Sequence, residues 1–93
     1  MTALDHARRQ HADAEHALED ARDRYEAAGW SHLQAPTDRS CQTLTVAAAH
    51  FQAAREVLCT AQVRLADAEV EARFDLDWQA AVEATRTTLR RAA

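Results

Sequence analysis

The histidines are the residues of this sequence whose type and spacing come closest to a chemical site. His6, His11 and His16 recur every five residues, and imidazole is the commonest metal ligand in proteins. Five residues advance about 140° around an α-helix, so the three rings would leave a helix in different directions. His32 and His50 stand apart from them and add no ligand spacing. We therefore expect no metal site and no cofactor.

The sequence also lacks the short motifs of the common enzyme classes. It contains no Cys–His pairing, no serine nucleophile elbow and no glycine-rich phosphate loop. Glycine and proline occur once each, which leaves room for a single loop. Catalytic groups usually lie on loops held over a rigid scaffold. We expect a protein that is not an enzyme and that has no small-molecule substrate.

The balance of charge favours a protein partner over nucleic acid or a membrane. Eleven arginines and fifteen acidic residues give a net charge of −4, which disfavours non-specific binding to nucleic acid or to anionic lipid. The outward positions of the first helical segment form an acidic strip that could dock a basic protein surface. The acidic strip consists of Asp5, Asp13, Glu19, Asp20 and Glu26. The alternative is a solvated face, because arginines four residues along the helix partly neutralise it.

The C-terminal end of the sequence carries the opposite charge. Arg86, Arg90 and Arg91 lie where the dipole of a final helix favours cations, which explains them without a ligand. Contact with phosphates is their alternative role, and it gives a second hypothesis, a nucleic-acid-binding accessory protein. The acidic net charge and the missing recognition-helix motif weaken this alternative.

The cysteines and the amino-acid usage suggest where the protein works. Cys41 and Cys59 are separated by about 27 Å on one predicted helix, so they cannot form a disulfide within the chain. Free thiols without an apolar leader segment are typical of a reducing, cytoplasmic compartment. No stretch approaches the ~18 apolar residues of a membrane span. Abundant alanine and arginine indicate a GC-rich genome. The small size and acidity are compatible with a bacterial or phage protein, which we expect.

Each of two long helical segments repeats a seam of small and apolar residues at alternating steps of three and four, with alanine at every second position. The seam positions are Leu4, Ala7, His11, Ala14, Leu18, Ala21, Tyr25 and Ala28, then Leu44, Ala47, Phe51, Ala54, Leu58, Ala61, Leu65, Ala68 and Ala72. Antiparallel packing sets large residues against alanines, which resembles the close-packed coiled coils called Alacoils. A short loop favours Ala14 opposite Phe51 over a register shifted by a heptad, with Ala14 opposite Leu58.

The helix breakers set the boundaries within a single all-helical domain. Gly29 suits the residue just beyond a helix, and Pro36 disfavours helical geometry at Ala35. Thr37 offers a side-chain oxygen to cap the helix that follows. We expect a helix over 3–28, a loop over 29–37, a helix over 38–73 and a helix over 76–91.

The seam ends after Ala72, where we expect the chain to fold back into a third helix capped by Asp75 or Asp77. The apolar face of this third helix would consist of Trp78, Ala81, Val82, Thr85 and Leu89. It would pack on a second stripe of the long helix, made of Cys59, Val63, Ala66, Val70 and Phe74. The alternative is one uninterrupted helix over 38–91, which no glycine or proline forbids. The expected fold is all-α: an antiparallel helical hairpin plus a shorter C-terminal helix, a three-helix bundle that dimerisation would complete.

A stripe outside the seam is the expected partner or dimer interface. Arg55 and Glu56 are the only charged residues between Cys41 and Val63, and a helix that is apolar nearly all round is a buried helix. The stripe consists of Val46, Ala49, His50, Ala53 and Val57. We interpret it as a contact surface for a second copy, giving a homodimer, or for another protein. The alternative is that the C-terminal segment or the loop covers it.

The loop holds two further candidates. Trp30 and Leu33 either close the end of a helical core or anchor a partner.

Taken together, these patterns predict a non-enzymatic protein–protein interaction module. It would act by occluding or scaffolding a protein partner, as a small inhibitor or adaptor encoded by a phage or mobile element.

Overall fold

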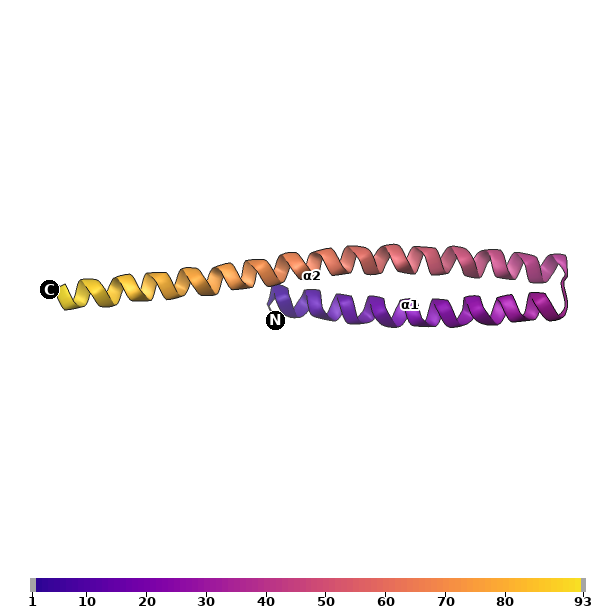
Figure 1. The fold of residues 1–93 in the computed structure, drawn as a ribbon, viewed down its shortest axis with the longest axis horizontal. Helices are drawn as coiled ribbons and strands as arrows, with labels where there is room; N and C mark the ends of the chain where they lie inside the picture. The colour runs from indigo at the N-terminus through magenta and orange to yellow at the C-terminus, as the bar shows by residue number, and fades with distance from the viewer. Residues whose placement is uncertain (1, 93) are drawn as a thin grey trace.

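Residues 2–92 are described by a computed structural model, in which they form two α-helices joined by residues 35–37. Helix α1 (Ala3–Gln34) has 32 residues, and helix α2 (Asp38–Ala92) has 55. Figure 1 shows α1 running antiparallel beside the first part of α2, while the C-terminal part of α2 continues alone beyond the start of α1. The molecule is therefore an extended rod that measures 84 × 17 × 14 Å.

The predicted hairpin closed into a three-helix bundle is wrong. Helix α2 passes through Asp75 and Asp77 without a break, so the alternative of one uninterrupted helix is the one found. The physical reason is that α2 contains no glycine or proline, and an aspartate inside an exposed helix costs less than about 1 kcal/mol relative to alanine. Phe74 and Trp78 remain 65% and 63% exposed, because no third helix covers them within residues 2–92.

The start of α1 is fixed by a capping box. The backbone N–H of Asp5 donates to the hydroxyl of Thr2 at 3.1 Å, and the hydroxyl and N–H of Thr2 donate to the Asp5 carboxylate at 2.9 and 3.3 Å. These hydrogen bonds from Thr2, with a smaller contribution from the charge of Arg8, hold the pKa of Asp5 below its ordinary value. Asp5 therefore has a structural role in its own helix.

The connection between the helices is tied by side chains. The N–H of Ala35 donates to the carbonyl of Ser31 at 3.1 Å and ends α1. The N–H of Ser40 donates to the hydroxyl of Thr37 at 3.0 Å, and the N–H of Thr37 donates to the hydroxyl of Ser40 at 2.9 Å. The predicted cap by Thr37 is thus confirmed. His32 Nδ1 lies 2.7 Å from the Ser40 hydroxyl, which joins the last turn of α1 to the first turn of α2.

The prediction that Gly29 ends the first helix is wrong. Its backbone is not left-handed, and α1 continues for five further residues. A glycine inside a helix costs only about 1 kcal/mol relative to alanine, which packing against α2 outweighs. The helix ends instead where Pro36 disfavours helical geometry at Ala35. Trp30 and Leu33 consequently lie in the last turns of α1 and not in a loop.

A methyl group at position 29 is expected to stabilise the protein. A Cβ built on Gly29 would meet Leu44 Cδ1 at 4.0 Å, an ordinary van der Waals distance. Gly29→Ala should therefore raise the free energy of unfolding by about 0.5–1 kcal/mol, because alanine loses less backbone entropy on folding. Urea denaturation followed by circular dichroism measures the change. A lower stability would show that α1 needs glycine for its approach to α2.

The register of the two helices also differs from the expected one. The rings of Tyr25 and Phe51 stack with their centroids 5.7 Å apart. Because Tyr25 lies three turns from Ala14, Phe51 cannot face Ala14 as well, and the register shifted by a heptad, with Ala14 near Leu58, is the one found. The physical reason is the longer α1, which moves the centre of the turn from residue 33 to residue 36 and so shifts the facing pairs by nearly a heptad.

Alanine methyl groups form the contact between α1 and α2. The buried residues of the described chain are the seam alanines Ala7, Ala14, Ala28, Ala47 and Ala61. The larger seam residues Leu18, Phe51 and Leu58 are half-buried, because a pair of helices encloses each side chain from one direction only. The seam continues to Ala72, and beyond it α1 no longer lies beside α2 (Figure 1).

Candidate functional site

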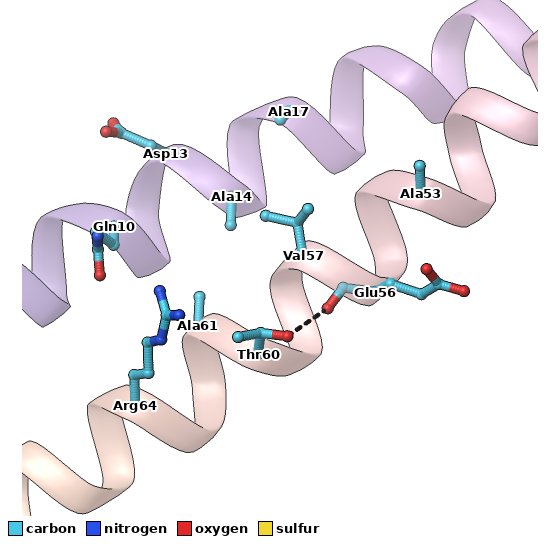
Figure 2. Close-up of a pocket in the computed structure, with 10 residues that line it drawn as sticks. All are labelled: Gln10, Asp13, Ala14, Ala17, Ala53, Glu56, Val57, Thr60, Ala61 and Arg64. Atoms are coloured by element: carbon cyan, nitrogen blue, oxygen red, sulfur yellow. Dashed lines mark hydrogen bonds between the residues drawn. The ribbon is translucent and has the colours of Figure 1, made fainter.

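One face of the helix pair carries a long shallow groove, which we call the alanine groove. It consists of two open hollows of about 680 and 650 Å³ that share Ala17. The first is lined by Gln10, Asp13, Ala14, Ala17, Ala53, Glu56, Val57, Thr60, Ala61 and Arg64, and Figure 2 shows these side chains on both helices. The second is lined by Ala17, Asp20, Ala21, Arg24, Ala27, Ala28, Ser31, Thr43, Val46, Ala47 and His50.

The structure places most of the predicted interface stripe in this groove. Val46 and His50 line one hollow, and Ala53 and Val57 line the other. Val46 and Val57 are 53% and 58% exposed, although they are β-branched apolar side chains. Ala49 is exposed on α2 but lines neither hollow.

The wall that α1 contributes was missed by sequence reasoning. It is built around Ala17 and Ala27, which lie beside the seam residues Ala14 and Ala28. The sequence spacing could have identified these two alanines. A residue three positions after a seam alanine lies on the same side of the helix as a residue one position before a seam alanine. Small residues there leave the floor of the groove low and open.

The threonines of the alanine groove use their hydroxyl groups within their own helix. The hydroxyl of Thr60 donates to the carbonyl of Glu56 at 3.1 Å, the dashed line in Figure 2, and that of Thr43 donates to Arg39 at 3.0 Å. Each threonine satisfies its hydroxyl on its own helix, so the groove remains mainly apolar between charged edges.

Larger side chains occupy the opposite face of the helix pair. Tyr25 and Phe51 stack there, and the guanidinium carbon of Arg55 lies 5.9 Å from the centroid of the Phe51 ring. The hollows on this face are smaller, about 360 and 280 Å³. The two faces therefore differ in shape, and the alanine groove is the one with space for another chain.

The structure divides the predicted acidic strip between these faces. Asp13 and Asp20 lie at the α1 edge of the alanine groove, whose other side holds most of the predicted interface stripe. Glu19 and Glu26 line the smaller hollows of the opposite face, and Asp5 caps α1. The strip is not a single surface, because the positions of the heptad repeat point its members to both sides of the seam.

The candidate loop anchors occupy the turn end of the rod. Trp30 and Leu33 are 67% and 76% exposed, and they line a hollow of about 360 Å³ with Tyr25 and Leu44. They therefore neither close the seam nor lie in the alanine groove. Their apolar surface is open to solvent at the tip.

The candidate phosphate contacts lie at the other end. Arg86, Arg90 and Arg91 are exposed on the part of α2 that α1 does not reach. The guanidinium of Arg86 lies 4.0 Å from the carboxylate of Glu83, one turn earlier in the helix. The arginines and the alanine groove are thus separate features of the rod.

The side chains with metal-binding chemistry are not assembled. Within residues 2–92, no three His, Cys, Asp or Glu side chains gather as a metal site would require. His11 Nδ1 lies 2.8 Å from the carboxylate of Glu15, and His32 contacts Ser40. Cys41 and Cys59 are free thiols, both exposed.

Neither α1 nor α2 contains a stretch long and apolar enough to cross a bilayer, as judged over residues 2–92.

Comparison with protein-family models, with curated proteins and with solved structures finds no match to this chain. The surfaces of the chain itself therefore point to its function. Among them, the alanine groove combines apolar lining, length and charged edges.

Proposed function

We propose that this protein is a non-enzymatic helical interaction module that binds a helix of another protein in the alanine groove. The observation that carries the proposal is the groove itself, which runs from Thr43 to Arg64 along α2. This range corresponds to about 32 Å of helix, or six turns. Binding of an amphipathic helix in an apolar groove is a recurrent mode of peptide recognition.

The chemistry of the groove defines the partner helix. Its apolar face would contact Val46, Ala53 and Val57, with small or medium side chains, because the alanine floor permits close approach of the backbones. Asp13 at the α1 edge favours lysine or arginine on that flank of the partner, whereas Asp20 lies one turn from Arg24, which lines the same hollow. Binding would act by occlusion or scaffolding, as in a small inhibitor or adaptor.

We propose a cytoplasmic setting and a bacterial or phage source for this module. Two exposed thiols favour a reducing compartment such as the cytoplasm, where they stay unoxidised. The small size and the net charge of −4 are compatible with a bacterial or phage source. Self-association through the same stripe, the homodimer expected from the sequence, would compete with the partner helix for the groove.

Photo-crosslinking from the two faces tests the proposal. A photoreactive residue at Ala17 or Ala53 should crosslink one and the same protein in extracts of the source cell, at a helical segment identified by mass spectrometry. The matched positions Glu19 and Arg55, on the same helices but on the opposite face, should not. Equal crosslinking from both faces, or different proteins from Ala17 and Ala53, would contradict the proposal.

The nucleic-acid alternative makes a different prediction. If phosphate contacts by Arg86, Arg90 and Arg91 were the function, affinity for DNA or RNA would fall steeply between 50 and 200 mM salt. We expect no retardation of a 30-base-pair duplex or of single-stranded RNA at about 150 mM salt, because the net charge is −4. A retarded complex that is lost in Arg90→Glu would favour the alternative.

A further inference from the structure

A small hollow at the turn end of the rod lies apart from the alanine groove, and we call it the tip hollow. Its volume is about 360 Å³, and it shares no lining residue with either hollow of the groove. Tyr25, Trp30 and Leu33 supply its apolar surface on α1. Leu44 completes this surface from α2. Two aromatic side chains and two leucines thus border one space between the helices.

Gly29 contributes backbone alone to the lining of the tip hollow. It lies one turn after Tyr25 and one turn before Leu33, so these three residues form one column along α1. Glu26 and Trp30 are also four residues apart and form the neighbouring column. The backbone of α1 is therefore accessible between larger side chains at this point.

The fold itself does not require glycine at position 29. The φ angle of Gly29 is not positive, and a Cβ there would meet Leu44 Cδ1 at the ordinary distance of 4.0 Å. Gly29 is the single glycine of the sequence, and inside a helix it is less stable than alanine. Glycine also serves where a backbone approaches a ligand closely. Its place in the lining of the tip hollow points to that role.

Glu26 gives the tip hollow a negative charge. Within residues 2–92, neither ion pair includes its carboxylate, and no arginine lines the hollow. His32 also lines the hollow, and its Nδ1 lies 2.7 Å from the Ser40 hydroxyl, which holds the ring at the turn. A carboxylate beside open aromatic rings attracts a cation, because the face of an aromatic ring carries partial negative charge.

We propose that the tip hollow binds an organic cation, an alkylated ammonium group, with Tyr25 and Trp30 against its methyl groups and Glu26 as its counter-ion. Quaternary ammonium ligands are recognised in this way, by aromatic rings that surround the charge. The backbone at Gly29 lets the group approach α1 closely. The site is separate from the alanine groove and does not depend on the helix proposed to bind there.

The size and order of the tip hollow suit such a ligand. Its 360 Å³ lies within the range of small-molecule sites, roughly 300–1,000 Å³. The ring of Tyr25 stacks on Phe51 with the centroids 5.7 Å apart, so one wall is in place before the ligand arrives. Alkylated ammonium groups occur in free amines such as choline and on methylated lysine side chains.

An NMR titration of the isotope-labelled full chain tests the inference, at about pH 7.5, where most imidazole is uncharged. Choline should shift the Gly29 amide signal and the Trp30 indole N–H signal, with a Kd of roughly 1–10 mM. Its neutral analogue, in which carbon replaces the nitrogen, should bind at least about 10-fold more weakly. The indole of Trp78, on the uncovered part of α2, is the internal control and should not shift.

Single substitutions assign the contacts. Trp30→Ala and Glu26→Gln should each weaken choline binding about 3–5-fold, as expected for a cation at an exposed aromatic site. Gly29→Ala should weaken it at least about 3-fold while it raises thermal stability, a combination that a purely structural glycine would not give. Glu19→Gln removes a carboxylate from the same helix outside the tip hollow and should leave the affinity unchanged.

A peptide that carries a trimethyl-lysine is the second probe. Tighter binding of this peptide than of choline would assign the cation to another protein, and weaker binding would assign it to a free amine. The inference would be overturned if neither probe shifted the Gly29 and Trp30 signals up to about 50 mM. Equal shifts by the neutral analogue would also overturn it, as would unchanged choline affinity in Glu26→Gln or in Gly29→Ala.

Discussion

Ala14→Leu is expected to lower the free energy of unfolding by about 1–3 kcal/mol. Ala14 is 4% exposed, and its methyl group lies in the seam between α1 and α2. Three extra carbon atoms would push the helices apart, because the neighbouring half-buried Leu58 already fills the space opposite. Urea denaturation monitored by circular dichroism gives the change directly.

The matched control for this prediction is Ala17→Leu, one turn along the same helix. Ala17 is exposed in the α1 wall of the alanine groove, so its enlargement meets solvent and should change stability by less than about 0.5 kcal/mol. Equal destabilisation by both substitutions would show that α1 does not present Ala14 to α2. The same control shows whether helix propensity alone accounts for any effect.

Phe51→Ala is expected to lower the free energy of unfolding by about 2–3 kcal/mol, since it removes a half-buried aromatic ring and its stacking on Tyr25. The planes of the two rings are inclined by 19° at a centroid distance of 5.7 Å. This contact also defines the register of the helices. Thermal unfolding at a low protein concentration measures the loss.

Phe74→Ala provides the comparison, because it deletes the same side chain from the uncovered part of α2. Phe74 is 65% exposed and belongs to the part of α2 that continues beyond α1 (Figure 1), so the unfolding of the helix pair should change by less than about 1 kcal/mol where the chain is monomeric. A larger loss in Phe74→Ala than in Phe51→Ala would contradict the placement of these two residues.

The sequence identified the contact surface of the helices through alanine periodicity. Every alanine that is buried, such as Ala7 or Ala61, occupies a position in the three–four alternation. The inference succeeded because close packing of helices depends on local residue size, which a heptad pattern records directly. Thr37 as a cap is similarly local, and its hydrogen bond to Ser40 is present.

The overall architecture depends on small differences in free energy between continuing a helix and ending it, and the sequence pattern does not give these differences. The sequence pattern predicts helix ends at Gly29 and near Asp75, but each of these residues costs about 1 kcal/mol or less inside a helix, and continued helix formation outweighs that cost. Because the predicted helix end at Gly29 comes too early, the predicted turn and the predicted register are also shifted. The three-helix bundle failed at Asp75 for the same reason.

The sequence predicted the α2 side of the candidate site but not its α1 side. Val46, Ala53 and Val57 on α2 stood out because charge is scarce around them, whereas Ala17 on α1 lies in a charged segment and did not. A groove between two helices depends on their register, which brings Ala17 and Ala53 to the same hollow. That register follows from the position of the turn, and the predicted turn lies too early in the chain.

Helix α2 is one continuous helix whose last third is uncovered, and a distance within α2 tests this arrangement most directly. Spin labels at Thr45 and Thr88 would be introduced by cysteine substitution in a Cys41→Ser, Cys59→Ser background and diluted with unlabelled chain. Double electron–electron resonance should then give a separation of about 65 Å, at ~1.5 Å of rise per residue. A separation of about 25–30 Å, which a chain folded back near Asp75 would produce, would contradict the account.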